Sequence, residues 1–368
     1  NNEGMTISHE ALNNLYNDAQ FKVICANVLD EDGHLPRHIA TSYIKEIEDV
    51  RFLFVAATAP FTPFYRALDW IVTDPLEAIK DEIEQRKGQY DVLIVMSHVG
   101  VFFDEKLCQE IPEIDVILGS HTHHHFNHGE VNNGVLMAAA GKYGHYLGEV
   151  NLTIENKKVV TKEATLHPVD TLPVVKTHFD EEGKDLMNKA IINKPVSLSS
   201  KTNVITKTTY LLAESVYEFT NADCTIINAG LIVNNVESDQ LTEYDIHTML
   251  PHPINLVRVR LKGSELKKVI LKSQKQEYMY EHVQGLGFRG DIFGGYILYK
   301  CGFIQSEHRF FVDGQEIEDN RTYILGTVDM YTFGRYFPLL KGTSIDYLMP
   351  EFLRDIFKEK LIHMHHSS

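Results

Sequence analysis

The sequence is poor in positive charge. Its 368 residues carry 35 Lys and Arg against 51 Asp and Glu, which gives a formal net charge of −16 with histidine neutral. No extended run of Lys or Arg occurs, so the chain lacks the basic surface that binds a phosphate backbone. A nucleic-acid polymer is therefore disfavoured as a partner, whereas a single nucleotide held by a metal ion is not.

Long apolar runs are also lacking. The longest uncharged stretch, residues 52–65, contains Pro60 and Pro63 and is shorter than the roughly 18 residues that cross a bilayer. We therefore expect no membrane partner. The 43% hydrophobic content still indicates a chain with buried cores. At roughly 150 residues per domain, the length predicts two domains.

Cysteine is scarce and scattered. Cys25, Cys108, Cys224 and Cys301 lie far apart and form no CxxC pair, so neither a disulfide framework nor a cysteine-based zinc site is indicated. We expect buried or idle thiols in a reducing compartment, hence a cytoplasmic protein. The chain opens at residues 1–4 without methionine or signal peptide, which is typical of an internal stretch of a longer protein.

In the first half, predicted strands and helices alternate. Asp74-Pro75 is a strong helix start, because aspartate caps free backbone N–H groups and proline suits the first helical position. The expected elements are a helix at 8–16, strands at 21–26 and from 52, a helix from 75, a strand at 91–96, a helix at 104–111 and a strand at 114–118. This order is typical of a layered α/β domain whose strands are buried on both faces.

The second half predicts a mixed α/β domain. Asp313-Gly314 between two apolar runs predicts a hairpin, because these residues tolerate the positive φ angles of a two-residue turn. We also expect a helix at 208–220, strands at 224–228 and 255–261, and a helix from 263. Between the halves, the alternation of predicted strands and helices gives way to prolines and charged residues. We therefore expect one domain at 1–165, a linker at 166–190 and a second domain at 191–360.

Histidines follow two successive buried strands of the first domain. His98 follows the strand that ends at Met96, and His121 and His123 follow the strand that ends at Leu118. If the helix between these strands is a right-handed crossover, the strands are parallel and the three imidazoles meet at one edge of the sheet. Neutral imidazole is a preferred ligand of zinc, manganese, iron and nickel, so this edge predicts a metal site.

A structural interpretation of these histidines stays open. Five of the eight residues at 121–128 are histidine, which a polar surface loop can also produce. A single histidine after a strand, such as His98, is more often structural than a ligand. Their joint occurrence after two successive strands favours metal ligation. We assign no role to His124, His125 and His128.

These segments resemble motifs of a known family. Ser-His-Val-Gly at 97–100, Gly-Ser-His-Thr-His at 119–123 and Asn-Asn-Glu at 1–3 are similar to the last three motifs of the calcineurin-like metallophosphatases, in the branch with a 5′-nucleotidase C-terminal domain. The resemblance implies an α/β fold, a four-layer αββα sandwich followed by a substrate-recognition domain. It implies two divalent metal ions, for which zinc, manganese, cobalt and iron are all compatible. The metal ligands that it implies are Asn1, His98 and His121 on one ion and His123 on the other.

The resemblance extends into the second domain. The Asn228-Ala229-Gly230 loop is similar to the nucleotide-contacting loop of the family, and residues 327–329 are similar to its final substrate segment. The substrate-binding residues that this implies are Asn228, Gly230 and Asp329. Phe288 is a candidate for stacking on the base, with a place in the core as the alternative.

Several features depart from the family pattern. The opening Asp-x-His and Gly-Asp motifs, which supply the other ligands of the first metal, have no counterpart here, so the sequence predicts an N-terminally incomplete sandwich. Asn2 stands where the family has a histidine near the leaving group. Since asparagine donates a hydrogen bond but carries no proton, we expect a catalytic loss on the order of 10² to 10⁴. Val233 and Met330 replace an arginine and a base-stacking phenylalanine.

The sequence thus predicts a metal-dependent hydrolase of nucleotide phosphoesters, in which hydroxide held between two metal ions attacks phosphorus. The small-molecule substrate would be a nucleoside monophosphate, a 2′,3′-cyclic nucleotide or a nucleoside diphosphate-sugar. One alternative is a non-catalytic protein that binds metal or nucleotide at a degenerate site. Another is a fragment that is inactive by itself and binds one metal ion weakly.

Overall fold

The computed structural model describes residues 2–173, 177–275, 277, 279–283, 285 and 287–366. The chain forms two compact units, Asn1–Val175 and Lys176–Ser368, and each is described by itself. Within the described ranges, no helix has both the length and the apolar character that spanning a membrane requires.

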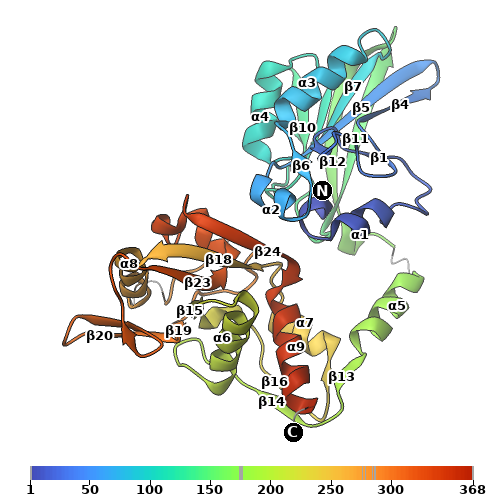
Figure 1. The fold of residues 1–368 in the computed structure, drawn as a ribbon. Helices are drawn as coiled ribbons and strands as arrows, with labels where there is room; N and C mark the ends of the chain where they lie inside the picture. Colours follow the sequence, from blue (N-terminus) through green and yellow to red (C-terminus); the bar gives the residue numbers. More distant parts are fainter. Residues whose placement is uncertain are drawn as a thin grey trace. The chain divides into compact units, whose positions relative to one another are not determined.

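A six-stranded sheet forms the centre of the first unit (Figure 1). Its order is β4 (Ser42–Ile47), β5 (Val50–Thr58), β7 (Val92–His98), β8 (Val116–Gly119), β10 (Val135–Ala138) and β9 (Glu130–Asn132). The four central strands are parallel, and the two outer strands pair antiparallel to their neighbours. The expected parallel pairing of the two histidine-bearing strands, β7 and β8, is confirmed.

Both faces of this sheet are covered. Helices α3 (Pro75–Gln85) and α4 (Val101–Glu110) lie on one face, where Leu93 packs with Ile79 and Leu107. The hairpin of β11 (Tyr146–Glu155) and β12 (Lys158–Pro168) packs on the other face, where Ile94 belongs to a second cluster. Successive strand residues therefore serve two cores, and each large apolar side chain contributes about 1.5–3 kcal/mol by its burial.

Helix starts in the first unit follow the expected capping chemistry. The Ser8 side chain accepts the backbone N–H of Ala11 at the start of α1 (His9–Asn14). The Asp74 carboxylate accepts the N–H groups of Leu76 and Glu77 at the start of α3.

The remaining short elements of the first unit are α2 (Thr62–Ala67), the pair β1 (Val23–Ile24) and β3 (Ile39–Ala40), and the pair β2 (Val28–Leu29) and β6 (Ile71–Val72).

The segment expected to be a linker, 166–190, contains regular structure. Strand β12 continues to Pro168, and α5 (His178–Met187) follows. At the start of α5 the Asp180 carboxylate accepts the backbone N–H of Thr177. The charges at 180–182 therefore belong to the first turn of a helix.

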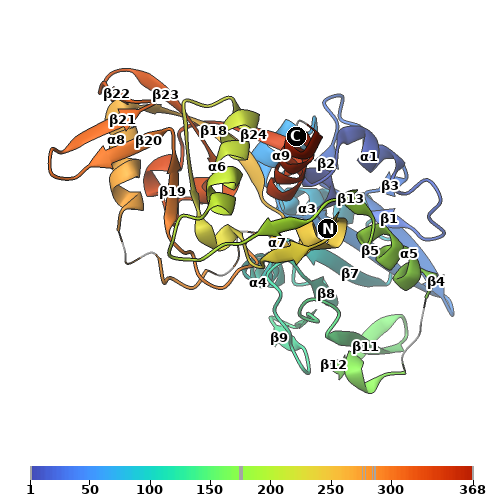
Figure 2. The ribbon, with the colours of Figure 1, turned by 90° about the horizontal axis from the view of Figure 1, so that it is seen from below.

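The second unit contains a mixed five-stranded sheet. Its order is β19 (Tyr296–Tyr299), β15 (Cys224–Asn228), β23 (Thr322–Val328), β18 (Asn255–Lys262) and β24 (Ser344–Phe352). Helices α6 (Lys207–Thr220) and α9 (Leu353–His366) lie side by side against the sheet, as Figures 1 and 2 show. Helix α8 (Gly263–Ser273) packs on β18 and β23.

The smaller elements of the second unit are helix α7 (Glu243–Met249) and two strand pairs. Strand β13 (Ala190–Ile192) pairs with β17 (Leu241–Thr242), and β14 (Val196–Leu198) pairs with β16 (Val236–Ser238).

A separate small sheet contains the predicted hairpin. It is formed by β20 (Cys301–Ile304), β21 (Arg309–Val312) and β22 (Gln315–Glu316). Between β21 and β22, Asp313 has φ 46° and Gly314 has φ 77°. These are the positive angles that a type I′ turn requires, so the predicted hairpin is confirmed.

A buried histidine joins two loops of the second unit. His252 is fully buried and stacks on Phe288, with ring centroids 4.9 Å apart. Its Nε2 donates to the Leu231 carbonyl (2.7 Å), and its Nδ1 accepts the backbone N–H of Arg289 (2.9 Å). Only the neutral ring makes both bonds, and burial lowers the pKa of His252 to about 4.

This packing predicts a pH-dependent stability of the second unit. The folded pKa of His252 lies below the value of about 6.5 in the unfolded chain, so its contribution is fully present above pH 6.5 and is lost as pH falls toward 4. The loss approaches about 3 kcal/mol. The variant His252→Phe should be less stable at pH 7 but should lack this dependence, measured by urea unfolding with tyrosine near-UV circular dichroism.

The difference between wild type and variant isolates His252. Burial raises the pKa of Asp329 to about 7, so this carboxyl destabilises the fold as pH rises from its unfolded pKa near 3.8 toward 7. This trend is opposite in sign and common to both proteins. Equal pH dependence in wild type and variant would contradict the assignment to His252.

Candidate functional site

Three parallel strands of the first unit end at one edge of its sheet. Thr58, the last residue of β5, pairs with His98, the last residue of β7. Ser97 of β7 in turn pairs with Gly119, the last residue of β8. This register brings the loop at 120–125 next to His98. The carboxyl edge of a parallel sheet is where α/β proteins commonly bind ligands.

At this edge two imidazoles face each other. Nε2 of His98 lies 3.4 Å from Nδ1 of His121, and the ring centroids are 5.1 Å apart with an interplanar angle of 72°. The other ring nitrogen of His98, Nδ1, is hydrogen-bonded to the Ser120 hydroxyl. Ser120 therefore holds the His98 ring with its Nε2 directed at His121.

Burial keeps both rings neutral at pH 7. Desolvation, with the nearby His121 and His123, lowers the pKa of His98 to about 3. Desolvation and His123 also lower the pKa of His121. Both rings thus have lone pairs available at neutral pH, and neutral imidazole is the form that binds a metal ion.

The histidine pair fits part of a metal site. Two nitrogens bound to one tetrahedral ion at about 2.0–2.1 Å lie roughly 3.4 Å apart, which is the separation of His98 Nε2 and His121 Nδ1. Across the part of the chain that the structure describes, no group of three or more His, Cys, Asp and Glu could hold a metal ion. The two histidines therefore fit as two ligands of one metal ion. A third ligand is needed to complete the site.

The loop that carries these histidines has an unusual backbone. His121 has φ 70° and His123 has φ 58°, a left-handed region that non-glycine residues adopt infrequently. Thr122 between them accepts the backbone N–H of Val101 at the start of α4 (3.1 Å). A Cβ on Gly100 would lie 2.7 Å from Thr122 Cγ2, so this contact requires glycine. Helix α4 consequently begins at Val101, three residues before the predicted start.

Of the other predicted residues of this site, the structure describes Asn2 and His123. Asn2 is half-buried, and its Oδ1 accepts the Thr58 hydroxyl at 3.5 Å. His123 is exposed, with its ring 6.4 Å from that of Tyr143, and its proximity contributes to the lowered pKa of both His98 and His121. Asn1, a predicted ligand, lies outside the described residues.

Sequence reasoning missed the residues that position the pair. Ser120 and Thr122 alternate with the histidines, and Thr58 ends a neighbouring strand. The hydroxyls of Ser120 and Thr122 form bonds that depend on how the loop folds back on β7 and α4, and the Thr58 hydroxyl donates to Asn2. No spacing in the sequence predicts these contacts. The one available signal is that Ser120 directly follows a buried strand and directly precedes His121.

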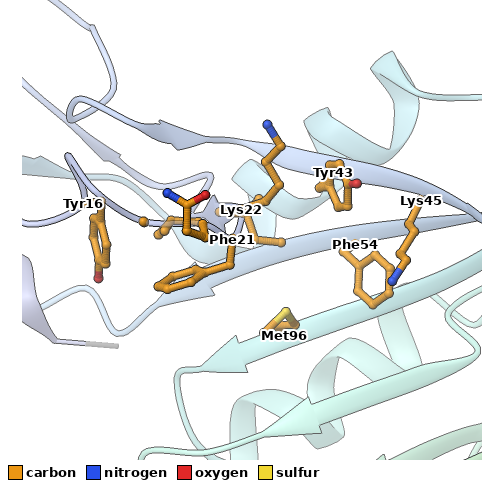
Figure 3. A pocket seen from close by; sticks show the side chains of 11 residues that line it. Tyr16, Phe21, Lys22, Tyr43, Lys45, Phe54 and Met96 are labelled. Atoms are coloured by element: carbon orange, nitrogen blue, oxygen red, sulfur yellow. The ribbon is translucent and has the colours of Figure 1, made fainter. Parts of the chain in front are cut away.

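An aromatic groove lies on the same face of the sheet as His98. Its volume is about 890 Å³, and it is lined by Phe54 of β5 and Met96 of β7 with Phe21 and Tyr43 (Figure 3). Met96 and His98 are two residues apart on β7, so both side chains point to this face. Lys22 and Lys45 belong to the same lining. The groove is separate from the histidine pair, because neither His98 nor His121 lines it.

In the second unit, the predicted substrate loop is tightly packed. Asn228 is fully buried, donates to the Phe293 carbonyl (2.6 Å) and accepts the Tyr331 hydroxyl (2.8 Å). A Cβ on Gly230 would lie 2.1 Å from the Ile292 carbonyl oxygen, so glycine is the only residue that fits there. Both residues therefore fix the loop at 228–230 against the segment at 292–293.

Phe288 and Asp329 are also buried. Phe288 stacks on His252, as described above, and is 4% exposed. One oxygen of Asp329 accepts the Asn255 N–H (3.1 Å), while its Oδ1 is buried without a hydrogen-bond partner. For Phe288 the structure shows the alternative of a core position. A substrate-binding role for Asn228, Gly230, Phe288 and Asp329 stays a prediction.

The two positions of this unit that depart from the family pattern, 233 and 330, have different surroundings. Val233 is 40% exposed, whereas Met330 is fully buried. The aromatic residues around Met330 are packed against one another rather than arranged on a surface. This cluster consists of Phe293, Tyr296, Tyr331, Tyr336 and Phe337.

Known proteins are similar to this chain in both of its units. Residues 189–340 match the family model of the 5′-nucleotidase C-terminal domain. The uncharacterised metallophosphoesterase YunD of Bacillus subtilis is 35% identical over 381 residues, which cover 98% of this chain and 82% of that protein.

Solved structures share the fold over nearly the whole chain. A candidate 5′-nucleotidase of Staphylococcus aureus, solved with alpha-ketoglutarate, has a TM-score of 0.71 at 15% identity and covers 98% of this chain and 79% of its own. The NAD nucleotidase NadN of Haemophilus influenzae has a TM-score of 0.58 at 16% identity and covers 100% and 80%. At these identities the likeness establishes the fold, a mixed α/β architecture with an N-terminal metallophosphatase domain and a C-terminal 5′-nucleotidase domain.

The resemblance read from the sequence motifs is thereby confirmed at the level of the family. Relatives of the chain in this family are phosphoesterases and nucleotidases. The chain belongs to the metallophosphoesterases that carry a 5′-nucleotidase C-terminal domain.

Proposed function

We propose that the protein hydrolyses nucleotide phosphoesters with the help of divalent metal ions bound at the carboxyl edge of the first sheet. The observation that carries the proposal is the facing of His98 and His121, whose nitrogens lie 3.4 Å apart in a partly desolvated position. A neutral histidine pair at the ends of two parallel strands, with a nitrogen of each ring directed at the other, has a donor arrangement that suits a metal ion.

His98, His121, His123 and Asn1 are the proposed ligands, as the family motifs imply. Divalent ions, when bound, lower the pKa of a coordinated water and offset the charge that develops on the phosphoryl oxygens. Imidazole and amide ligands accept zinc, manganese, cobalt or iron, and the ligand set does not distinguish them. The Ser120 hydroxyl holds the His98 ring so that Nε2 points into the site.

Asn2 is the proposed partner of the leaving group. Its Oδ1 accepts the Thr58 hydroxyl, which leaves the amide N–H groups free to be donors toward a phosphoryl or leaving oxygen. An amide donor stabilises developing negative charge but cannot supply a proton to the departing oxygen. We therefore propose slow turnover, most marked for substrates whose leaving group needs protonation.

The second unit is proposed to recognise the nucleotide. The rigid loop at 228–230 and the segment around Asp329 correspond to the substrate segments of the family. Because Asn228, Phe288 and Asp329 are buried, we propose that they set the shape of these segments, which contact the base and ribose largely through backbone groups. A monophosphate, a 2′,3′-cyclic nucleotide and a nucleoside diphosphate-sugar are the substrate classes to compare.

The histidine pair generates the first test. In the natural full-length protein, His121→Ala should lower kcat/KM for chelator-sensitive phosphatase activity at least about 100-fold, because it removes a ligand. Manganese affinity, measured by calorimetry, should fall with it. His125→Ala is the matched control, since His125 stacks on Tyr146 (5.6 Å between centroids) in the same loop. Activity that survives His121→Ala unchanged would remove the proposal.

Ser120 generates a second test. Ser120→Ala should weaken metal binding by about 10- to 100-fold, the usual effect of removing a hydrogen bond to a ligating histidine. Ser120→Thr keeps the hydroxyl and should retain most of the affinity. Calorimetric titration with manganese or zinc measures both. Equal affinity in Ser120→Ala and the wild type would show that the hydroxyl does not orient His98.

Asn2 distinguishes a weakened enzyme from a binding protein. If the intact protein is an enzyme, Asn2→His should raise kcat on 5′-AMP, 2′,3′-cyclic AMP or a UDP-sugar by about 10² to 10⁴, the contribution of a general acid. Asn2→Gln, which adds no titratable group, is the control. The absence of turnover in both Asn2→His and the wild type, with nucleotide binding retained, would favour the alternative of a non-catalytic binder.

A further inference from the structure

Two cysteines of the second unit begin neighbouring segments of its sheet. Cys224 is the first residue of β15, and Cys301 is the first residue of β20, directly after β19. Thr225 pairs with Tyr299 across the antiparallel β15–β19 ladder. Continued by one residue, this register sets Cys224 opposite Lys300, and Cys301 is the next residue after Lys300. For such a diagonal pair we expect a Cα separation of about 6 Å, within the range of roughly 4.4–6.8 Å that a disulfide spans.

A backbone turn directs both thiols to the same side of the ladder. In an uninterrupted ladder, Cys224 and Cys301 would point to opposite faces, because side chains alternate. Lys300 lies between β19 and β20 with φ 59°, a left-handed conformation that breaks the alternation. The Cys301 thiol consequently points back to β15, where it lies 3.9 Å from the Thr225 carbonyl oxygen.

Both cysteines border the same apolar core. Cys301 packs against the buried apolar cluster that contains Cys224. The hydrogen bond between the thiols, together with burial, raises the pKa of Cys224. Cys25 and Cys108 are free thiols of the first unit.

The two thiols differ in access to solvent. Cys224 is fully buried, whereas Cys301 is half-buried. Cys301 also lines a hollow of about 470 Å³ together with Tyr210, Lys300 and Phe311. A small oxidant can therefore reach Cys301 from this hollow, whereas Cys224 is fully buried and does not line it. A reactive cysteine with a second, buried cysteine as its neighbour is the arrangement of a redox pair.

We propose that Cys224 and Cys301 form an oxidation site that closes reversibly to an intrachain disulfide when the protein meets hydrogen peroxide. The Cys301 sulfur attacks the peroxide O–O bond, which gives a sulfenic acid and one water. The Cys224 sulfur then attacks this sulfenic sulfur, and its proton leaves with the hydroxyl group as a second water. Both thiols are oxidised, one peroxide is reduced to two waters, and a dithiol reductant reverses the change.

The disulfide would link the start of β15 to the β20–β21 hairpin. Strand β15 ends at Asn228, which begins the packed loop at 228–230. The new bond would therefore restrain the strand that carries this loop. The inference concerns the second unit alone, and it stands whether or not the first unit proves to be a phosphoesterase.

Mass spectrometry tests the proposal directly. After treatment with hydrogen peroxide and removal of the excess, the intact protein should lose the mass of two hydrogen atoms. Denatured protein should then bind two fewer alkylating groups than the untreated sample. A non-reducing digest should contain the Cys224 peptide joined to the Cys301 peptide, and dithiothreitol should restore the original mass.

Variants identify the pair. Cys301→Ser should abolish the mass loss and the linked peptide, and Cys224→Ala should replace them with a sulfenic or sulfinic product at Cys301. Cys25→Ser is the matched control and should leave the linked peptide unchanged. Near-UV circular dichroism checks that each variant is folded. An unchanged mass in the treated wild type, a sulfinic product at Cys301 without a linked peptide, or a disulfide between two chains would overturn the proposal.

Discussion

The parallel register of β5, β7 and β8 is the constraint on which the candidate site depends. It pairs Thr58 with His98 and Ser97 with Gly119, so three strands end level with one another. Because side chains alternate along a strand, a slip of one residue would turn His98 to the helix-covered face. The apolar residues on both faces prevent such a slip: Leu93 and Val95 pack under α3 and α4, whereas Ile94 packs toward the β11–β12 hairpin.

The register alone does not orient the imidazoles. It brings the loop at 120–125 to His98, but the direction of each ring is set by Ser120 and by the left-handed backbone at His121. The same loop is tied to α4 through Thr122, which requires glycine at position 100. The arrangement therefore couples the edge that carries the candidate site to the helix that connects its two strands. A strained backbone of this kind persists only where the surrounding contacts determine it.

Much of the fold could be predicted because its signals are local. Ser8 and Asp74 cap helices through bonds to residues two or three positions ahead, and the Asp313-Gly314 turn follows from the positive φ angles that its own two residues tolerate. The parallel pairing of β7 and β8 followed from one crossover rule. The facing of His98 and His121 followed in turn from that pairing, since residues at the ends of neighbouring parallel strands meet at one edge.

What escaped prediction depends on contacts between distant segments. The start of α4 at Val101 reflects the contact of Gly100 with Thr122, more than twenty residues away along the chain. The burial of Asn228 against Phe293, and of Phe288 against His252, is set by how two loops close on each other. A motif identifies such residues, but it does not say how they act. One side chain can touch a ligand, whereas another only supports a backbone segment that touches the ligand.

Charge gives the site a further physical requirement. The chain carries a net charge of −16, so a phosphorylated substrate approaches against a repulsive field. Burial keeps His98 and His121 uncharged at neutral pH, so the ligand side chains themselves contribute no positive charge to counter it. In the proposed function, the attraction for phosphate must come from the ions that these imidazoles bind. Metal loading would then control substrate affinity as well as turnover, because the same ions supply the local field and the reactive water.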